Sequence, residues 1–173
     1  MKTMKEPFRR LAEKYSDRIF TFAWYSLRNR EEAEDVTQEV LVKLWQHVEE
    51  IEPGKLTAWV LKVTRNAVID VSRRSRAKAA VFAEGLEFES VPAASAGRVL
   101  DPEEALRASE LRTEFEAALA ALDDPYRSIV IMREIQGLSY ADIARGLDLP
   151  LNTVKVYLHR GRLLLRKALK GMV

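Results

Sequence analysis

Apolar residues recur three and four positions apart along almost the whole chain, a spacing that collects them on one side of an α-helix. No segment alternates apolar and polar residues long enough to predict a half-buried strand, and the 173 residues include only seven glycines. The sequence therefore predicts an all-α protein.

Three helices are expected in the first half of the chain, at about Leu11–Asn29, Glu31–Glu49 and Thr57–Arg74. Pro53-Gly54 breaks the chain before the third. The second helix begins with four carboxylates, which complement the positive end of a helix dipole. Its buried stripe is predicted to contain the apolar residues at helical spacing, namely Ala33, Val36, Val40, Leu44 and Val48.

A long segment without helical periodicity follows. From about residue 77 to residue 101 the chain is rich in alanine, glycine, serine, proline and acidic residues, the composition of a mobile connector. We therefore expect two small helical domains, residues 1–78 and 103–173, joined by a flexible acidic linker over residues 79–102.

Four helices are expected after the linker. They run from Pro102 to about Leu122, from Asp124-Pro125 to Gln136, from Tyr140 to Gly146 and from about Asn152 to Lys170. Ser139 is the expected N-cap of the third, and a tight turn at Leu147–Pro150 leads into the fourth. Two short helices joined by such a turn, the second of them basic, are typical of a helix-turn-helix that places its second helix in the DNA major groove.

Charge is segregated along the chain. Residues 55–80 carry seven Lys and Arg against one acid, and residues 127–173 carry nine against three. Between them, residues 81–126 carry eleven acids against three basic residues. Both basic blocks are interleaved with apolar residues, so they are predicted to be faces of folded helices. Two such faces suggest two contacts with a polyanion, although a solvated surface has the same composition.

Several functions are disfavoured. There are no cysteines, which excludes disulfides and thiol chemistry, and His47 and His159 lie too far apart in sequence to form a metal-spaced pair. No uncharged apolar run approaches the roughly 20 residues of a membrane span, and the N-terminal residues lack the apolar core of a secretory signal. We expect a cytoplasmic protein without membrane insertion, and with no catalytic residues, metal or cofactor.

The last predicted helix has a polar face that can reach base edges, because Lys and Arg read guanine and Asn reads adenine. The outward residues are Asn152, Lys155, Val156, His159, Arg160 and Arg166. Leu163 falls on this face too. It is either a simple exposed leucine or a site that another protein covers.

The second predicted helix also has a mixed outward face. Asp35, Gln38, Glu39 and Val42 share this face, and Trp45 flanks it. Polar residues beside an exposed valine and a tryptophan are typical of a protein interface, whereas an ordinary acidic helix surface is the alternative.

The third predicted helix combines basic, amide and aromatic side chains, a mixture that suits single-stranded nucleic acid. These residues are Trp59, Lys62, Arg65, Asn66, Arg73 and Arg74. A buried position is the alternative for Trp59. The preceding loop, Ile51–Leu56, contains Gly54 and Lys55 and is predicted to form one wall of a pocket against Asn66.

Six segments together carry a resemblance that covers nearly the whole chain. They are Glu31–Val40, Ala58–Leu61, Arg65–Asp70 with Arg73-Arg74, Leu138–Ala144, Thr153–Lys155 and Leu158–Arg162. In this order the sequence resembles bacterial RNA polymerase sigma factors of the extracytoplasmic-function (ECF) group. The resemblance implies that the first domain is sigma region 2 and the second is sigma region 4.

The resemblance also implies partners: core RNA polymerase, promoter DNA and an anti-sigma factor. It implies that Asp35, Gln38 and Glu39, with Val42 and Trp45 beside them, dock on the clamp helices of the beta-prime subunit, and that the beta flap is a further contact. It also implies that the minus-ten element is recognised by Gly54, Lys55, Trp59, Lys62, Arg65, Asn66, Arg73 and Arg74, with a flipped base held between the Ile51–Leu56 loop and Asn66. The minus-thirty-five element is then expected to be read by Ser139, Tyr140, Asn152, Thr153, Lys155, Val156, His159 and Arg160.

Other implications concern the linker and specificity. In the family the acidic linker threads through the polymerase active-site cleft. This sequence departs from the family at Val156-Tyr157 and Leu163-Leu164, so a promoter sequence is not carried over. Leu163 and Val42 are candidate contacts for an anti-sigma factor.

Two other function classes remain open from the residues alone. A free-standing helix-turn-helix regulator is expected to bind palindromic double-stranded DNA without polymerase. A hydrolase or transferase needs a nucleophile and base, or a metal cluster, which two isolated histidines do not provide.

Overall fold

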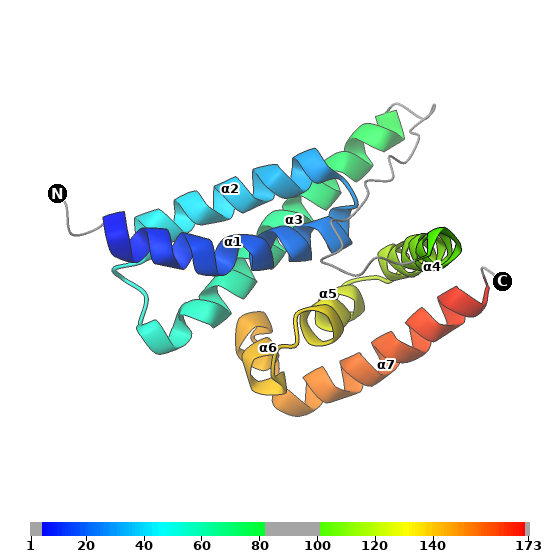
Figure 1. The fold of residues 1–173 in the computed structure, drawn as a ribbon. Helices are drawn as coiled ribbons and strands as arrows, with labels where there is room; N and C mark the ends of the chain where they lie inside the picture. The colour runs from blue at the N-terminus through cyan, green and yellow to red at the C-terminus, as the bar shows by residue number, and fades with distance from the viewer. Residues whose placement is uncertain (1–4, 82–100, 172–173) are drawn as a thin grey trace.

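The computed structural model describes residues 5–81 and 101–171, and the regular structure within these ranges is helical (Figure 1). The first range forms an N-terminal bundle of three long helices, α1 (Lys5–Leu27), α2 (Arg30–His47) and α3 (Leu56–Val81). A single 3₁₀ turn, η1 (Pro53–Lys55), leads into α3. The all-α prediction is therefore confirmed.

The junction of α1 and α2 is built by two adjacent residues. Arg28 has a positive φ of 53°, which ends α1 with a left-handed turn. Asn29 is the N-cap of α2, and its side-chain oxygen accepts a 3.0 Å hydrogen bond from the backbone N–H of Glu32. The chain therefore reverses within two residues, and α1 packs along α2.

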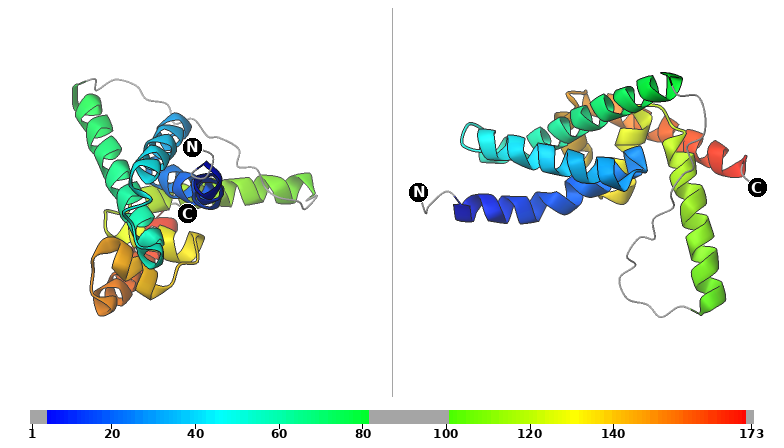
Figure 2. Two further views of the ribbon diagram at one scale, coloured as in Figure 1. Left: turned by 90° about the vertical axis from the view of Figure 1, so that its left-hand side faces the viewer. Right: turned by 90° about the horizontal axis from the view of Figure 1, so that it is seen from above.

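The second range forms a C-terminal bundle of α4 (Pro102–Ala120), α5 (Tyr126–Val130), α6 (Tyr140–Leu147) and α7 (Leu151–Lys170). A π-turn, η2 (Ile131–Ile135), continues α5. Residues 102–113 of α4 are exposed, and the view from above shows this helix projecting away from the others (Figure 2).

The helix-turn-helix consists of α6, a turn and α7. The Ser139 side chain caps α6 by accepting a 3.1 Å hydrogen bond from the Asp142 backbone N–H, which confirms the predicted cap. Asp148 ends α6 in the left-handed region with φ 53°. Gly161 allows α7 to pass close to α5, because a Cβ there would lie 2.8 Å from Cγ2 of Val130.

The two bundles share one hydrophobic core. Side chains that are almost fully buried come from both: Tyr15, Ile19, Phe22, Val36 and Leu44 from the N-terminal bundle, and Leu119, Ile129, Met132, Ile143 and Leu158 from the C-terminal bundle. The principal contact between the bundles is that of α3 with α6. There Leu61 is 3% exposed, and a Cβ built on Gly146 would lie 3.0 Å from the Leu61 Cβ. The absence of a side chain at Gly146 thus lets α6 lie directly against α3.

Three details differ from the sequence expectations. α3 continues to Val81 rather than ending near Arg74, and the Ser75 hydroxyl donates a 2.7 Å hydrogen bond to Glu32 Oε1 on α2. The helix after Pro125 changes to a π-turn at Ile131. Leu151, which helical spacing places on the same side as Val154 and Leu158, is 43% exposed, because the buried face of α7 begins only at Val154.

Most of the predicted linker, residues 82–100, lies outside the described residues. The structure thus gives no account of the path that the family resemblance implies for it. In the described ranges, no helix combines the length and apolar character needed to cross a membrane.

Candidate polymerase and promoter interfaces

The outward side of α2 carries the five residues expected at a protein interface, which we call the α2 face: Asp35, Gln38, Glu39, Val42 and Trp45. All five are exposed, Val42 by 54% and Trp45 by 38%. The Trp45 ring meets Phe8 of α1 edge to face, with centroids 4.7 Å apart. Lys43 donates to Glu39 Oε1 at 2.7 Å. The opposite side of α2 is anchored in the core by Ala33, Val36, Val40 and Leu44, so these exposed side chains stand on a fixed helix.

A hollow of about 370 Å³ lies beside the loop that precedes α3. Its lining residues are His47, Glu50, Ile51, Glu52, Lys55 and Trp59. Trp59 is half-buried, and its ring centroid lies 6.0 Å from that of His47. Asn66 does not line this hollow, because it lies two helical turns further along α3. This hollow is thus bounded by the loop, the end of α2 and Trp59, and the pocket between the loop and Asn66 stays a prediction.

The basic residues of α3 fall into two groups. Arg73 and Arg74 are exposed near the far end of the helix. Lys62 and Arg65 instead reach across to the C-terminal bundle, where Lys62 pairs with Asp148 and Arg65 pairs with Asp124. Two of the predicted nucleic-acid residues therefore already have anionic partners within the chain.

The outward side of α7 carries the exposed residues Asn152, Lys155, Val156, His159 and Arg160, with Thr153 half-buried. Within the described ranges, Lys155, His159 and Arg160 make no side-chain hydrogen bond or ion pair. Val154 and Leu158 on the opposite side are buried in the core and fix the rotation of the helix. This face of α7 is therefore open to a polyanionic partner.

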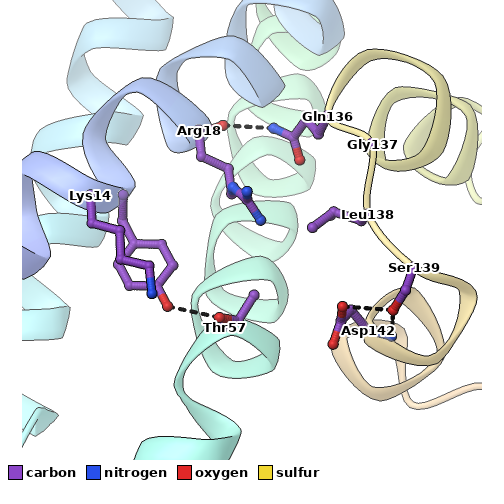
Figure 3. A pocket seen from close by; sticks show the side chains of 9 residues that line it. Lys14, Arg18, Thr57, Gln136, Gly137, Leu138, Ser139 and Asp142 are labelled. Carbon is purple, nitrogen blue, oxygen red and sulfur yellow. Dashed lines mark hydrogen bonds between the residues drawn. The ribbon is translucent and has the colours of Figure 1, made fainter.

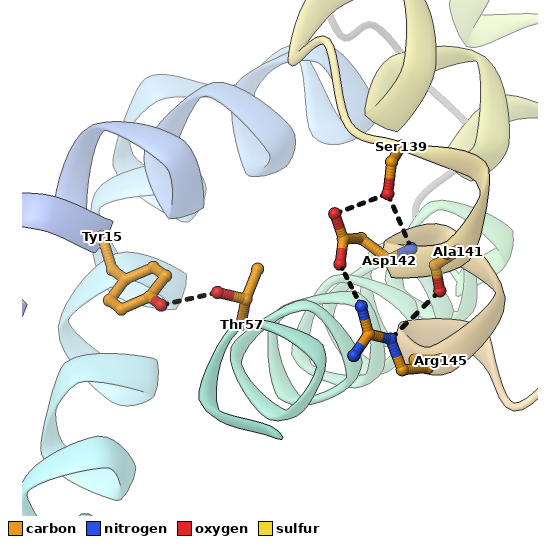
Figure 4. A network of polar contacts seen from close by, with 6 residues as sticks. All are labelled: Tyr15, Thr57, Ser139, Ala141, Asp142 and Arg145. Atoms are coloured by element: carbon orange, nitrogen blue, oxygen red, sulfur yellow. Dashed lines mark hydrogen bonds and ion pairs between the residues drawn. The ribbon is translucent and has the colours of Figure 1, made fainter. Parts of the chain in front are cut away.

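Ser139 and Tyr140, both predicted to contact DNA, already make contacts within the chain. Besides capping α6, the Ser139 hydroxyl donates a 2.6 Å hydrogen bond to Asp142 Oδ2, and Arg145 donates to the other oxygen of that carboxylate (Figure 4). The guanidinium carbon of Arg133 lies over the Tyr140 ring, 4.7 Å from the centroid of that ring. Both residues help to hold α6 in position.

A second hollow, of about 430 Å³, lies between the bundles (Figure 3). α1 contributes Lys14, Tyr15 and Arg18, and α3 contributes Thr57. The segment before α6 contributes Gln136, Gly137, Leu138 and Ser139, and α6 itself contributes Asp142. The Gln136 side-chain amide donates a 2.8 Å hydrogen bond to the carbonyl oxygen of Arg18. The Tyr15 and Thr57 hydroxyls lie 2.7 Å apart (Figure 4).

Arg127 adds a charged contact to this boundary. Its Nη1 donates to the carbonyl oxygen of Ser26 at 3.0 Å, and its Nε donates to the carbonyl oxygen of Leu122 at 2.8 Å. Burial lowers the pKa of Arg127, and the nearby Arg76 lowers it further, whereas Asp124 and Asp123 oppose the shift. The two bundles are therefore held together by hydrogen bonds as well as by apolar packing.

Two family models match the chain in the order of its bundles. The model described as sigma-70 region 2 matches residues 11–78, and the model described as sigma-70, region 4 matches residues 112–165. The ECF RNA polymerase sigma factor SigW of Bacillus subtilis is 30% identical over 172 residues, covering 97% of this chain and 91% of that protein. The chain belongs to the ECF RNA polymerase sigma factors.

Two further comparisons relate this sigma factor to known proteins. The ECF RNA polymerase sigma factor SigE of Mycolicibacterium smegmatis is 33% identical over 157 residues, an alignment that covers 90% of this chain and 59% of SigE. The sigma factor RpoE from Bartonella quintana, solved in complex with the anti-sigma factor NepR, matches with a TM-score of 0.74 and 26% identity. That match covers 95% of this chain and 98% of the RpoE chain.

Membership of the family assigns this sigma factor to transcription initiation, without enzymatic activity of its own. The sigma region 2 match falls on the N-terminal bundle, with the α2 face and the basic side of α3. The region 4 match contains α5, α6 and most of α7.

The sequence reasoning missed Asp124 and Asp148 at this sigma factor's domain boundary. Asp124 lies 59 residues from its partner Arg65, and Asp148 lies 86 residues from Lys62. The only available signal was the isolation of Asp148, a single acid in the turn before a wholly basic helix.

Proposed function

We propose that this sigma factor binds core RNA polymerase and directs it to promoters through both bundles. The observation that supports this most directly is the presence of sigma regions 2 and 4 on one chain, in that order. Each region offers an exposed surface of the required chemistry. Because formation of phosphodiester bonds belongs to the polymerase, the sigma factor supplies recognition only.

The α2 face is the proposed docking surface for the clamp helices of the beta-prime subunit. Asp35, Gln38 and Glu39 supply hydrogen-bond acceptors and a donor, and the exposed Val42 and Trp45 supply apolar area. A polar surface that surrounds an aromatic anchor is the usual composition of a protein interface. The C-terminal bundle is proposed to meet the beta flap.

The minus-ten element is the proposed ligand of α3 and the loop before it. Lys62, Arg65, Arg73 and Arg74 provide positive charge along one strand of DNA, and Trp59 provides a surface for stacking. Extruding a base costs a few kcal/mol of stacking and pairing, so a site that captures one must offer comparable contacts. The hollow beside Trp59, with Gly54 and Lys55 in the adjacent η1 turn, is a place for such contacts.

The minus-thirty-five element is the proposed ligand of α7. Lys155 and Arg160 can donate to guanine, and Asn152 can pair with adenine, whereas Val156 suits the methyl group of thymine. Thr153 and His159 complete this face, and Ser139 and Tyr140 lie at the start of α6, where a helix-turn-helix approaches the phosphate backbone.

An anti-sigma factor is the proposed regulator. The RpoE structure that this chain resembles contains the anti-sigma factor NepR. On this chain the exposed Val42 of α2 and Leu163 of α7 are candidate contacts, because both are apolar and about half exposed. Regulation of this kind, together with polymerase binding, assigns the protein to the cytoplasm.

The decisive experiment is co-elution of the purified chain with bacterial core RNA polymerase on size exclusion. The wild type is expected to co-elute, and the double variant Asp35→Ala with Gln38→Ala is expected to lose most of the complex. The matched control, Asp17→Ala, removes one exposed negative charge outside the α2 face, as the α2 variant does, and should co-elute like the wild type. Absence of a wild-type complex would remove the proposed function, and equal binding of the α2 variant would remove the docking assignment.

A further inference from the structure

We propose that Asp124 and Asp148 occupy the positions of DNA phosphates on α3, so that the packed arrangement of the two bundles withholds Lys62 and Arg65 from promoter DNA. This inference rests on the proposed function, in which these two cations contact the minus-ten element. It adds an autoinhibitory contact within the chain itself, which needs no second protein.

Both acids are carried by connections of the C-terminal bundle and both partners lie one helical turn apart on α3. Asp148 is the left-handed residue that ends α6, and its Oδ2 accepts from Lys62 Nζ. Asp124 precedes α5, and its Oδ2 accepts from Arg65 Nη2 while its Oδ1 accepts from the Ser128 hydroxyl. The two carboxylates therefore present negative charge to consecutive turns of α3, as the phosphates of a bound strand would.

The hydrogen-bond donors of Arg65 are only partly used in this arrangement. Its Nε is buried, and no hydrogen-bond acceptor is found for it in the described part of the chain. Asp124 thus engages the guanidinium through Nη2 alone, although arginine can donate two parallel hydrogen bonds to one anion. A phosphate that accepts from both nitrogens is the better partner, so DNA can displace Asp124.

An apolar contact next to these two ion pairs covers the same side of α3. Leu61 of α3 is buried at 3% exposure, and α6 approaches it so closely that a Cβ on Gly146 would lie 3.0 Å from the Leu61 Cβ and 3.1 Å from its Cδ1. α6 therefore covers the surface of α3 around Leu61, whereas the Lys62 side chain stays about half exposed and is engaged through its ion pair with Asp148.

The two ion pairs supply only part of the stability of the closed arrangement. The Lys62 and Asp148 side chains are 53% and 67% exposed, and those of Arg65 and Asp124 are 25% and 30% exposed. Each such ion pair shifts an equilibrium by about fivefold, and salt weakens the more exposed Lys62–Asp148 pair further. To open the chain, a polymerase or promoter therefore has to replace the apolar packing of Leu61 and the hydrogen bonds of Arg127 and Gln136 as well as these two ion pairs.

The test measures the separation of the bundles directly. The chain contains no cysteine, so Glu49→Cys and Lys167→Cys, both at exposed positions, give two unique sites for a fluorescent donor and acceptor. The opening variant is Asp124→Asn with Asp148→Asn, which removes both charges while keeping the side-chain shape, and asparagine tolerates the positive φ at position 148. The control is Glu103→Gln with Glu110→Gln, which removes two exposed charges from the same bundle.

A second variant addresses the apolar contact independently of charge. Gly146→Ala adds a methyl group against Leu61. Alanine favours a helix more than glycine does, so the substitution supports α6 itself while it pushes α6 away from α3. It should therefore open the bundles without weakening the helix-turn-helix.

Energy transfer is expected to fall in the Asn double variant and in Gly146→Ala, and to stay at the wild-type value in the Gln control. In parallel, the affinity for a fluorescein-labelled single-stranded DNA of mixed sequence should rise about tenfold in the Asn variant beyond any gain in the control. Raising the salt concentration should open the wild type more than the Asn variant.

Two results would overturn the proposal. Unchanged energy transfer in both opening variants would show that these contacts do not hold the bundles together. Opening without a gain in DNA affinity beyond the control would show that the contacts do not block DNA. In that case Lys62→Gln with Arg65→Gln is added to the Asp124→Asn, Asp148→Asn variant. A loss of DNA affinity keeps the assignment of Lys62 and Arg65 to the minus-ten element. Unchanged DNA affinity removes that assignment together with the proposed block.

Discussion

The guanidinium of Arg127 in α5 donates a 3.0 Å hydrogen bond to the backbone carbonyl oxygen of Ser26 in α1, 101 residues away in sequence. A charged side chain of the region 4 bundle thereby satisfies a backbone group of the region 2 bundle. Because Ser26 is 7% exposed, little water is available to replace the donor if Arg127 is removed.

We expect Arg127→Met to lower the free energy of unfolding by about 1–3 kcal/mol, since it leaves the carbonyl oxygens of Ser26 and Leu122 without this donor. Methionine keeps much of the apolar volume, so the loss reports mainly on the hydrogen bonds. Urea unfolding followed by circular dichroism measures the change. Arg145→Met, at an exposed arginine on α6, should cost about 0.5 kcal/mol or less, and equal losses would contradict the role given to Arg127.

Gly161→Ala should lower the free energy of unfolding, because the added Cβ lies 2.8 Å from Cγ2 of the buried Val130. Overpacking of about 1–3 kcal/mol outweighs the roughly 1 kcal/mol that alanine gains over glycine in a helix. In a Val130→Ala background the obstructing methyl group is gone, so Gly161→Ala should become stabilising. A double-mutant cycle by urea unfolding tests this change of sign, and a loss of the same size in both backgrounds would refute the steric explanation.

Lys155→Ala should reduce affinity for the minus-thirty-five element by about 1–3 kcal/mol at one base position if the ammonium group reads a base edge. Fluorescence anisotropy with a set of single-base duplex variants measures this directly. The control is Lys170→Ala, which removes the same single positive charge at the end of the same helix. A uniform loss over all sequences would make Lys155 a phosphate contact instead.

Asn66→Ala should impair promoter opening more than formation of the closed complex, because its exposed amide on α3 is proposed to contact the melted strand. Permanganate reactivity of unpaired thymines reports opening, and polymerase retention on duplex DNA reports closed binding. Asp70→Ala changes an exposed residue one turn further along α3 and should leave the ratio of the two signals unchanged. Normal opening by Asn66→Ala would count against its assignment to the minus-ten site.

Local features of the fold were predictable because each depends on neighbouring residues. The buried stripe Ala33, Val36, Val40 and Leu44 follows from helical spacing, and the capping role of Ser139 follows from its place before an apolar helix. Asn29, by contrast, was assigned to the end of the first helix although it caps the second. A side-chain amide can end one helix or begin the next, and the positive φ at Arg28 decides between them.

The contacts between the bundles were not predictable from spacing. Lys62 and Arg65 have the sequence signature of a solvated basic face, and nothing local indicates that Asp148 and Asp124 reach them. Leu61 likewise shows no local signal of a contact with another bundle, yet it is buried because α6 covers it. The hollow beside the Ile51–Leu56 loop likewise combines residues of two helices, His47 and Trp59, whose proximity helical spacing does not give.

The turn between α6 and α7 aims the recognition helix, and its first residue, Asp148, also touches α3 of the other bundle. A chimera that replaces residues 103–173 with the corresponding part of a relative would change this turn and the residue facing Lys62 at the same time. Promoter choice and the ease with which the chain opens would then change together in such hybrids. Engineering a new specificity on this scaffold therefore calls for grafting the outward residues of α7 alone, while keeping Asp124, Gly146 and Asp148 in place.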